Sequence, residues 1–512
     1  LLHGVTGSGK TLVYLEAIAE ALALGRGVIV MVPEISLTPQ LTGRMRRRFG
    51  EDVLVSHSGL SQIERRDVWR MIEKGKARIV VGPRSVVFAP VRDLGLIVID
   101  EEHDDSYKQS EPAPRYHGRD AALYRAYRCG ATVLMGSATP DVCSYKNAGE
   151  GRYHLLELRE RYGDGALPDV WVVKWGIDAK GRGISPRLEK SLRQCLARDE
   201  QAIILVNRRA FSTVIRCPDC GEVATCPNCD ITLRYHRVGQ KLVCHYCGYV
   251  QRVIDTCPKC HGHRLSYGGM GTQRLQRELE LLLPDARVGR MDVDTTHGRG
   301  AHQEILARFA RHDFDILIGT QMVAKGHDFP RVTLVGVLSA DLEWLRPDFR
   351  AMEKAYRLLT QASGRTGRAG AGEVVIQAWD PTHPMLRWVQ EHNYRKLFNE
   401  EIHFRNELRY PPYSDLISIL VRGSERENVG KAALSLREAL IGENLNCEIL
   451  GPAPPPIERI ENLYRKKLLL KLPRRKRVAA RNVKARLQDA IRKVERNYKD
   501  IKIIADVDPA EI

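Results

Sequence analysis

Long hydrophobic runs are absent from this sequence of 512 residues, whose apolar stretches are short and strand-like. None approaches the roughly 18 residues of a membrane-spanning helix, so we expect no membrane partner. A signal-peptide pattern is also lacking, and the chain begins LLHGVTGSGK without Met, so we expect that an N-terminal part precedes it. Internal repeats and low-complexity tracts are missing too. A cytoplasmic protein fits these absences.

Isolated cysteines are few as well. Of twelve cysteines, eight form four Cys-x-x-Cys pairs between Cys217 and Cys260, and four are scattered. Secreted disulfide scaffolds are shorter and richer in cysteine than this chain. Reduced thiols in a cytoplasmic protein are therefore the better interpretation.

Negative charge is in short supply, with 63 Asp and Glu against 80 Lys and Arg and a net charge of +17. The excess is uneven, because the segment from Arg465 to Lys499 carries fifteen basic residues against Asp489 and Glu495. A concentrated basic surface predicts a polyanion partner, nucleic acid before membrane. A solvated basic helix face is the alternative.

The order of apolar segments predicts several α/β domains. In residues 1–150, continuous runs such as GVIVMVP and LGLIVID alternate with amphipathic segments, as in a parallel sheet covered by helices. An Arg-, Gly- and Pro-rich linker (151–186) leads to a second such lobe (187–390), which an insertion at 213–266 interrupts. The final part, 391–512, has a β-α-β-β-α-β order and predicts a small α+β module for DNA or partner binding.

A phosphate-binding loop opens the first lobe. The segment GVTGSGKT fits G-x-x-x-x-G-K-[ST] between a strand and a helix, which is the context that the motif needs. Lys10 would reach the β- and γ-phosphates of ATP, and Thr11 would bind Mg²⁺. The predicted nucleotide-binding residues are Gly4, Val5, Thr6, Gly7, Ser8, Gly9, Lys10 and Thr11.

Two carboxylates follow a buried strand in LGLIVIDEEH. The strand would deliver Asp100 and Glu101 to the carboxyl edge of the sheet, where α/β folds bind ligands. We expect Asp100 to hold Mg²⁺ through water and Glu101 to activate the attacking water.

A glutamine and two arginines mark the second lobe in QASGRTGRAG, residues 361–370. Arg365 and Arg368 are three residues apart, so they can share a helix face and point at the charge developing on the γ-phosphate. Together with Lys10, Asp100, Glu101 and Gln361, they are the predicted catalytic residues.

The four Cys-x-x-Cys pairs predict two Zn²⁺ sites, each with four thiolates. Sequential pairing would close one site over five residues, and crossed pairing would entangle the loops. Nested pairing closes the inner site over residues 230–243, close to zinc-ribbon spacing. Redox-active dithiols are the alternative. The expected ligands are Cys217, Cys220, Cys257 and Cys260 in the outer site and Cys226, Cys229, Cys244 and Cys247 in the inner one.

These motifs carry a family resemblance. GSATP, the Asp-Glu-Glu-His sequence and Gln-x-x-Gly-Arg-x-Gly-Arg resemble superfamily 2 helicases, which have two RecA-like lobes. MVPEISLTPQ, GPRSVVFAP, GTQMVAKGHDFP and the inserted cysteines narrow the likeness to the PriA family (primosomal protein N′) of bacterial replication restart. The resemblance runs essentially from end to end, and the family also nests its zinc ligands.

The resemblance implies an ATP-dependent 3′-to-5′ DNA helicase that acts at stalled or branched forks and promotes primosome assembly. Its implied partners are single-stranded and forked DNA, single-stranded DNA-binding protein, and primosome and helicase-loading proteins. In the family's aromatic-rich loop, Tyr107, Lys108, Arg115 and Tyr116 would sense single-stranded DNA and signal to Glu101. Another superfamily 2 translocase or an RNA helicase is the first alternative, and a zinc-ribbon binding module with a purely structural nucleotide site is the second.

Overall fold

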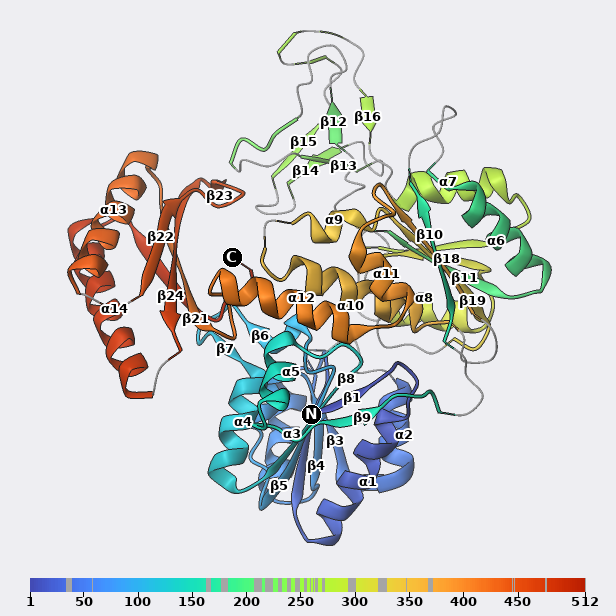
Figure 1. The fold of residues 1–512 in the computed structure, drawn as a ribbon, viewed down its shortest axis with the longest axis horizontal. Coiled ribbons are helices and arrows are strands. Elements are labelled where there is room, and N and C mark those ends of the chain that lie inside the picture. Colours follow the sequence, from blue (N-terminus) through green and yellow to red (C-terminus); the bar gives the residue numbers. More distant parts are fainter. Residues whose placement is uncertain are drawn as a thin grey trace. The chain divides into compact units, whose positions relative to one another are not determined.

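The structure is a computed structural model in which two compact units can be distinguished (Figure 1). The first contains Leu1–Asn207 and Thr272–Ile402, and the second contains Arg208–Gly271 and His403–Ile512. The residues that it describes are 1–33, 39–57, 59–162, 167–175, 183–206, 214–216, 224–228, 233–236, 241–244, 249–252, 256–257, 259–260, 262, 266–268, 272–292, 301–320, 329–346, 348–366, 372–443, 445, 447–474 and 477–511.

The first lobe is a parallel sheet with helices on both faces, as expected. Residues of β2 are almost fully buried because alternate side chains pack on opposite helix layers. In Figure 1, α1 and α2 lie on one side of the sheet and α4 and α5 on the other. The strand order is β3 (Val53–Val55), β4 (Ile79–Gly82), β2 (Gly27–Met31), β5 (Leu94–Asp100), β8 (Thr132–Ser137), β1 (Leu2–Gly4) and β9 (Leu156–Leu158). The helices are α1 (Lys10–Ala23), α2 (Pro39–Phe49), α3 (Gln62–Glu73), α4 (Gly118–Cys129) and α5 (Val142–Gly149).

The second lobe repeats this plan, and one buried cluster continues from the first lobe into it. Its parallel strands run in the order β10 (Asp169–Lys174), β20 (Glu373–Ala378), β19 (Val332–Leu338), β11 (Gln201–Val206), β18 (Ile316–Gly319) and β17 (Val288–Met291). The helices are α6 (Pro186–Ala197), α7 (Thr272–Leu282), α8 (Ala301–Ala310), α9 (Asp341–Trp344), α10 (Ala351–Ser363), α11 (Pro384–Gln390) and α12 (Tyr394–Glu407).

Two boundaries differ from those that the sequence suggested. The segment 151–186, interpreted as a linker, supplies β9 to the first sheet and β10 to the second. The C-terminal module starts later than residue 391, because Tyr394 and Leu397 are buried in the core that the two lobes share. β9 has only three residues, and both β9 and β10 lie at the edges of their sheets.

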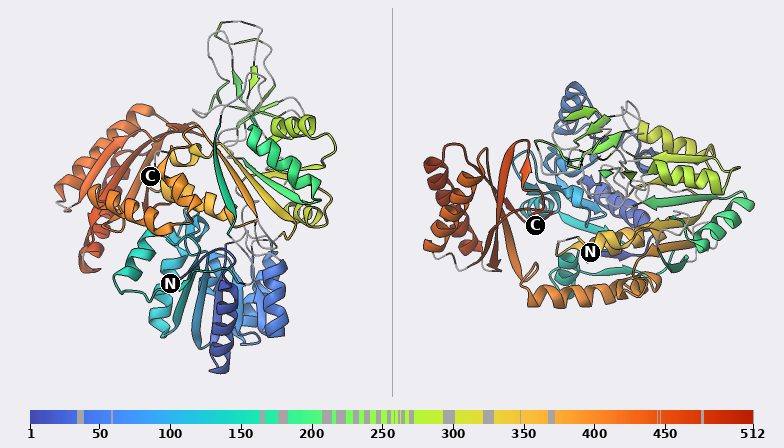
Figure 2. Two further views of the ribbon diagram at one scale, coloured as in Figure 1. Left: turned by 45° about the vertical axis from the view of Figure 1, so that its right-hand side comes forward. Right: turned by 90° about the horizontal axis from the view of Figure 1, so that it is seen from above.

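The second unit contains two antiparallel sheets. The cysteine-rich insertion pairs β15 (Val250–Arg252), β14 (Lys241–Val243), β13 (Arg234–His236), β12 (Val214–Arg216) and β16 (Ser266–Gly268). The C-terminal module orders β22 (Glu448–Ala453), β24 (Leu463–Pro473), β21 (Ser414–Gly423) and β25 (Lys502–Val507), with β23 (Arg459–Ile460) paired to β24. Helices α13 (Arg426–Gly442) and α14 (Arg477–Asn497) lie together on one side of the C-terminal sheet (Figures 1 and 2).

Candidate active site

The phosphate loop links β1 to α1 in a conformation that glycine favours. Gly7 and Gly9 have φ of 84° and 85°, a left-handed backbone that other residues rarely adopt. A Cβ on Gly4 would lie 2.5 Å from the Ser8 hydroxyl oxygen, so that position has no room for a side chain. The Lys10 ammonium donates to the carbonyls of Gly4 (2.8 Å) and Val5 (3.3 Å). The amides and the lysine thus form a cradle that suits a polyphosphate.

The carboxylates at the end of β5 lie in an electronegative site. The Tyr14 hydroxyl donates to Asp100 Oδ1 at 2.9 Å. Burial raises the pKa of Asp100, and the Lys10 charge opposes that rise. The pKa of Glu101 is raised to about 7, first by burial and then by the Asp100 charge. Two carboxylates that repel each other beside a phosphate cradle are suitable ligands for Mg²⁺.

Gln361 brings the second lobe to these carboxylates. Its amide nitrogen lies 3.5 Å from Glu101 Oε2 and 3.1 Å from His103 Nε2. The other ring nitrogen of His103 lies 2.6 Å from the Ser137 hydroxyl at the end of β8. The predicted general base is therefore connected, through a buried histidine, to a side chain of the opposite lobe.

The first of the two predicted arginine fingers also acts on Glu101. The Arg365 charge lowers the pKa of Glu101, against the larger effects of burial and Asp100. Arg368 lies outside the described residues.

The phosphate loop and the glutamine–arginine segment are packed closely. A Cβ on Gly364 would come within 2.5 Å of Thr6 Cγ2, so the two loops approach at a distance that only glycine permits. Arg161 donates to the Thr366 carbonyl at 3.1 Å, and the Tyr162 amide donates to the Gly7 carbonyl at 2.9 Å. Sequence reasoning missed Arg161 and Tyr162, because they follow β9 within the supposed linker.

A buried ionic network, also missed, joins α10 to the first lobe. Arg357 donates to the His103 carbonyl at 3.0 Å, pairs with Glu353, and lies 3.6 Å from Asp141. Glu353 in turn accepts from the Val142 amide at 3.1 Å. The i, i+4 spacing of Glu353 and Arg357 was the available signal, but such pairs are usually found on solvated helix faces.

The predicted DNA-sensing loop divides into buried and accessible residues. Tyr107 is fully buried, and its hydroxyl oxygen lies 3.0 Å from the Met31 carbonyl and 2.6 Å from the Asp100 carbonyl, which share its single proton. Lys108 is also buried, whereas Arg115 and Tyr116 are partly exposed. Burial leaves Tyr107 no face on which a base could stack, so this part of the expected role does not fit. Tyr107 instead ties the loop to the strand that carries Asp100.

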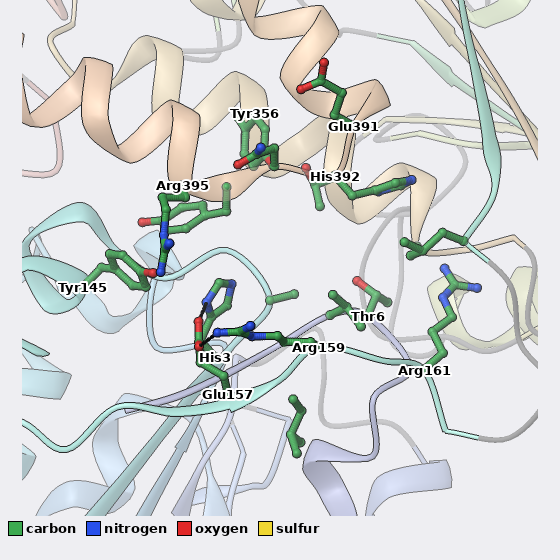
Figure 3. Close-up of a pocket in the computed structure, with 18 residues that line it drawn as sticks. His3, Thr6, Tyr145, Glu157, Arg159, Arg161, Tyr356, Glu391, His392 and Arg395 are labelled. Atoms are coloured by element: carbon green, nitrogen blue, oxygen red, sulfur yellow. Dashed lines mark hydrogen bonds and ion pairs between the residues drawn. The ribbon is translucent and has the colours of Figure 1, made fainter. Parts of the chain in front are cut away.

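A cavity of about 440 Å³ opens between the lobes beside the phosphate loop (Figure 3). Figure 3 shows His3, Glu157 and Arg159 on the first-lobe side, facing Tyr356 and Arg395 of the second. Burial lowers the pKa of His3 to about 4, so this side chain is neutral at physiological pH. Thr6 and Gly364, which approach each other closely, both line this cavity.

The cysteine pairs have the local geometry of zinc knuckles where they are described. The Asn228 amide donates to Cys226 Sγ and the Lys259 amide to Cys257 Sγ, each at 3.4 Å, and such bonds stabilise thiolates. Cys244 is buried, whereas Cys260 is exposed. Each expected site has only two ligands among the described residues, which therefore contain no complete metal-binding group. The ligands outside the described residues are Cys217, Cys220, Cys229 and Cys247.

Two RecA-like lobes, with a phosphate loop and acidic strand end on one and a glutamine–arginine segment on the other, define a protein of the superfamily 2 helicase fold. Family profiles agree with this class. Residues 1–147 match the DEAD/DEAH box helicase family and residues 260–370 match the helicase conserved C-terminal domain. Residues 406–510 match the primosomal protein N C-terminal domain. Residues 226–252, which include all four expected inner-site cysteines, match the PriA DNA helicase Cys-rich region.

The chain belongs to the PriA family. It is 45% identical to the replication restart protein PriA of Bacillus subtilis over 99% of its own length. It is 39% identical to that of Chlamydia muridarum and 36% identical to that of Haemophilus influenzae, covering 68% and 70% of those relatives. The chain spans only 63% of the Bacillus subtilis relative. In the part of the chain that the structure describes, no helix combines the length and apolarity that crossing a membrane requires.

Proposed function

We propose that this chain is an ATP-dependent DNA helicase with 3′-to-5′ polarity, acting at stalled or branched replication forks to unwind DNA and promote primosome assembly. The contact of Gln361 with Glu101 and His103 supports the ATP-driven part of this proposal, and the replication restart relatives support its DNA and fork part. The Gln361 contact connects the predicted general base to the opposite lobe, so hydrolysis and lobe movement become mechanically coupled. A purely structural nucleotide site has no need of such a connection.

ATP and Mg²⁺ are the proposed cofactors of this site. The loop amides and Lys10 would hold the phosphates, while Thr11 and Asp100 would hold the metal, which supplies charge stabilisation to the transferred phosphoryl group. Glu101 would accept the proton of the attacking water, and Arg365 and Arg368 would balance the charge that develops on the γ-phosphate.

The zinc insertion and the sensing loop complete the proposal. Two Zn²⁺ ions would occupy the nested Cys₄ sites, giving the insertion a rigid scaffold without a large core. Arg115 and Tyr116 would contact single-stranded DNA, and the Tyr107 hydroxyl would transmit that contact to the Asp100 strand. The proposed protein partners are single-stranded DNA-binding protein and the primosome and helicase-loading proteins, because the curated relatives are replication restart proteins.

A turnover assay tests the motor. Lys10→Ala should reduce DNA-stimulated ATP hydrolysis by about 100-fold or more, since it removes the cation of the phosphate cradle. Lys74→Ala, an exposed lysine at the end of α3, serves as the matched control and should retain full activity. Comparable turnover by both variants would contradict the site.

The same assay separates the proposal from an RNA helicase. Stimulation by single-stranded and forked DNA should exceed stimulation by RNA of the same length and sequence. Stronger stimulation by RNA would favour the alternative substrate while leaving the motor intact.

A further inference from the structure

One face of the C-terminal sheet packs against α13 and α14, and the opposite face carries a different set of side chains. On β21, alternate residues Ile417, Ile419 and Val421 pack in the core that α13 and α14 complete. Because successive side chains of a strand point to opposite faces, the residues between them lie on the face away from both helices. Figures 1 and 2 show both helices on the same side of this sheet.

Three cations form a row across that other face. In the strand register, Arg422 of β21 lies opposite Arg465 of β24 on one side and opposite Lys502 of β25 on the other. Like charges directly opposite each other in an antiparallel pair destabilise the sheet. In the described part of the chain, neither Arg422 nor Lys502 forms an ion pair, and Arg465 donates to the Ile457 carbonyl. The row is therefore a repulsive feature within the sheet.

The nearest row of side chains is basic and aliphatic, and the row after it contains Ser418, Leu469 and one acidic residue, Asp506. The nearest row contains Ile504, Leu420 and a fourth cation, Lys467. Further along, Lys471 lies 4.0 Å above the Tyr410 ring and donates to the Leu408 carbonyl, so the preceding segment covers that end of the face. Lys502 is exposed, and Arg422 and Arg465 are partly exposed. The accessible end of the face thus combines four cations with two aliphatic side chains.

We propose that the row Arg422, Arg465 and Lys502 binds the phosphate backbone of duplex DNA. Strands lie about 4.8 Å apart, so the outer two cations are separated by about 10 Å, enough to contact more than one phosphate. Single-stranded DNA is usually held by aromatic side chains on which bases stack, and the two rows contain none. Backbone contact by arginine and lysine needs no base contact and suits a duplex.

This inference rests on the proposed function for its DNA partner, and it changes where the basic surface is expected. The sequence suggested the basic segment from Arg465 to Lys499 as a whole, and much of that segment is α14. Cations of α14 such as Lys484 and Arg492 are exposed and spread along that helix, where water and salt neutralise them at little cost. The sheet row is different, because its cations are held side by side by the register.

The test compares two double variants of the whole chain. The sheet variant carries Arg422→Gln and Lys502→Gln, and the α14 variant carries Lys484→Gln and Arg492→Gln. Removing each cation that binds a phosphate should weaken duplex binding about tenfold at 0.1 M salt and reduce the slope of log affinity against log salt by about 0.9. The same sheet variant should unfold at a higher temperature without DNA, because like-charge repulsion is relieved. The α14 variant should change neither quantity.

Weaker duplex binding together with a higher unfolding temperature in the sheet variant would support the inference, because damaged folding would lower both quantities. Unchanged duplex binding, weaker binding confined to single-stranded DNA, or weaker duplex binding accompanied by lower stability would each overturn it. Failure of the proposed function appears separately, as an absence of DNA-stimulated ATP hydrolysis in the unmodified chain.

Discussion

Among individual residues, Glu101 combines an unusual backbone with an unusual acidity. Its φ of 48° is left-handed, which turns the side chain away from the line of β5 and towards Gln361. Its pKa of about 7 means that the carboxyl is ionised, and able to accept a proton, only in part at neutral pH. The charges of Lys10 and Arg365 lower this pKa, so they raise the ionised fraction of the Glu101 carboxyl.

The pH dependence of hydrolysis should show this effect. Activity should fall as pH drops through about 7, because the protonated carboxyl cannot accept a proton from water. Arg365→Gln removes a charge that lowers the Glu101 pKa, so the acidic limb should move to higher pH. The comparison uses Arg311→Gln, an exposed arginine of the same lobe, in steady-state assays from pH 5.5 to 9. An acidic limb at the same pH in both variants would mean that Glu101 does not determine it.

Among the helices, α10 aligns the contacts between the lobes. Glu353, Arg357 and Gln361 are spaced by four residues, and Arg365 follows after the next four, just beyond the helix end. Residues four apart lie on one helix face, so the ionic network and the Gln361 amide contact the first lobe together. Any rotation of α10 must change both sets of contacts.

Breaking the α10 network should be costly. Arg357→Met removes the ion pair of the buried Glu353 carboxylate, and we expect a loss of about 3–5 kcal/mol in the free energy of unfolding, measured with denaturant. Adding Glu353→Gln removes the buried charge but keeps an acceptor for the Val142 amide, so most of the stability should return. DNA-stimulated hydrolysis should not return, because the link to His103 is still missing.

The matched control is Arg387→Met on α11. Arg387 is exposed and pairs with Glu391 at i, i+4, and exposed pairs of this kind contribute about 0.5 kcal/mol or less. A similar loss of stability for Arg357→Met and Arg387→Met would contradict the role of the network.

Elements with a strong local signal were predictable, and those defined by tertiary contacts were not. The phosphate loop and the strand before Asp100 have motifs and long apolar runs, so both the fold class and their position followed from the sequence. The strands β9 and β10 are edge strands within a polar segment, so the sequence suggested part of a linker there. Burial of Tyr107 and Arg357 depends on what packs over them, and their residue types usually suggest exposed positions.

At the scale of the whole molecule, the cysteine-rich insertion differs from the rest of the chain in what stabilises it. The first unit has extensive apolar cores in which entire strands are buried. The insertion has few buried apolar residues in its described part, such as Leu233 and Leu242. Small scaffolds of this kind usually need metal or disulfides to fold. Metal loss should therefore affect the insertion and spare the motor core.

Zinc analysis can test this division of stability. The unmodified chain should contain two equivalents of zinc, and Cys226→Ser should contain about one, because the inner site loses a ligand. We expect the variant to retain ATP hydrolysis within about twofold while losing strand separation. Cys129→Ser, a change at an exposed cysteine of α4, is the control and should keep both metals. Simultaneous loss of both metals in Cys226→Ser would argue against two independent sites.

The path between the sheets sets a mechanical limit. β9 ends one sheet and β10 ends the other, so residues 159–168 are the covalent tether that joins the two sheets. A segment of that length, even when fully stretched, reaches roughly 35 Å. Any relative movement of the two sheets is therefore limited by this length, and a protease cut between residues 159 and 168 would remove that limit while leaving both sheets intact.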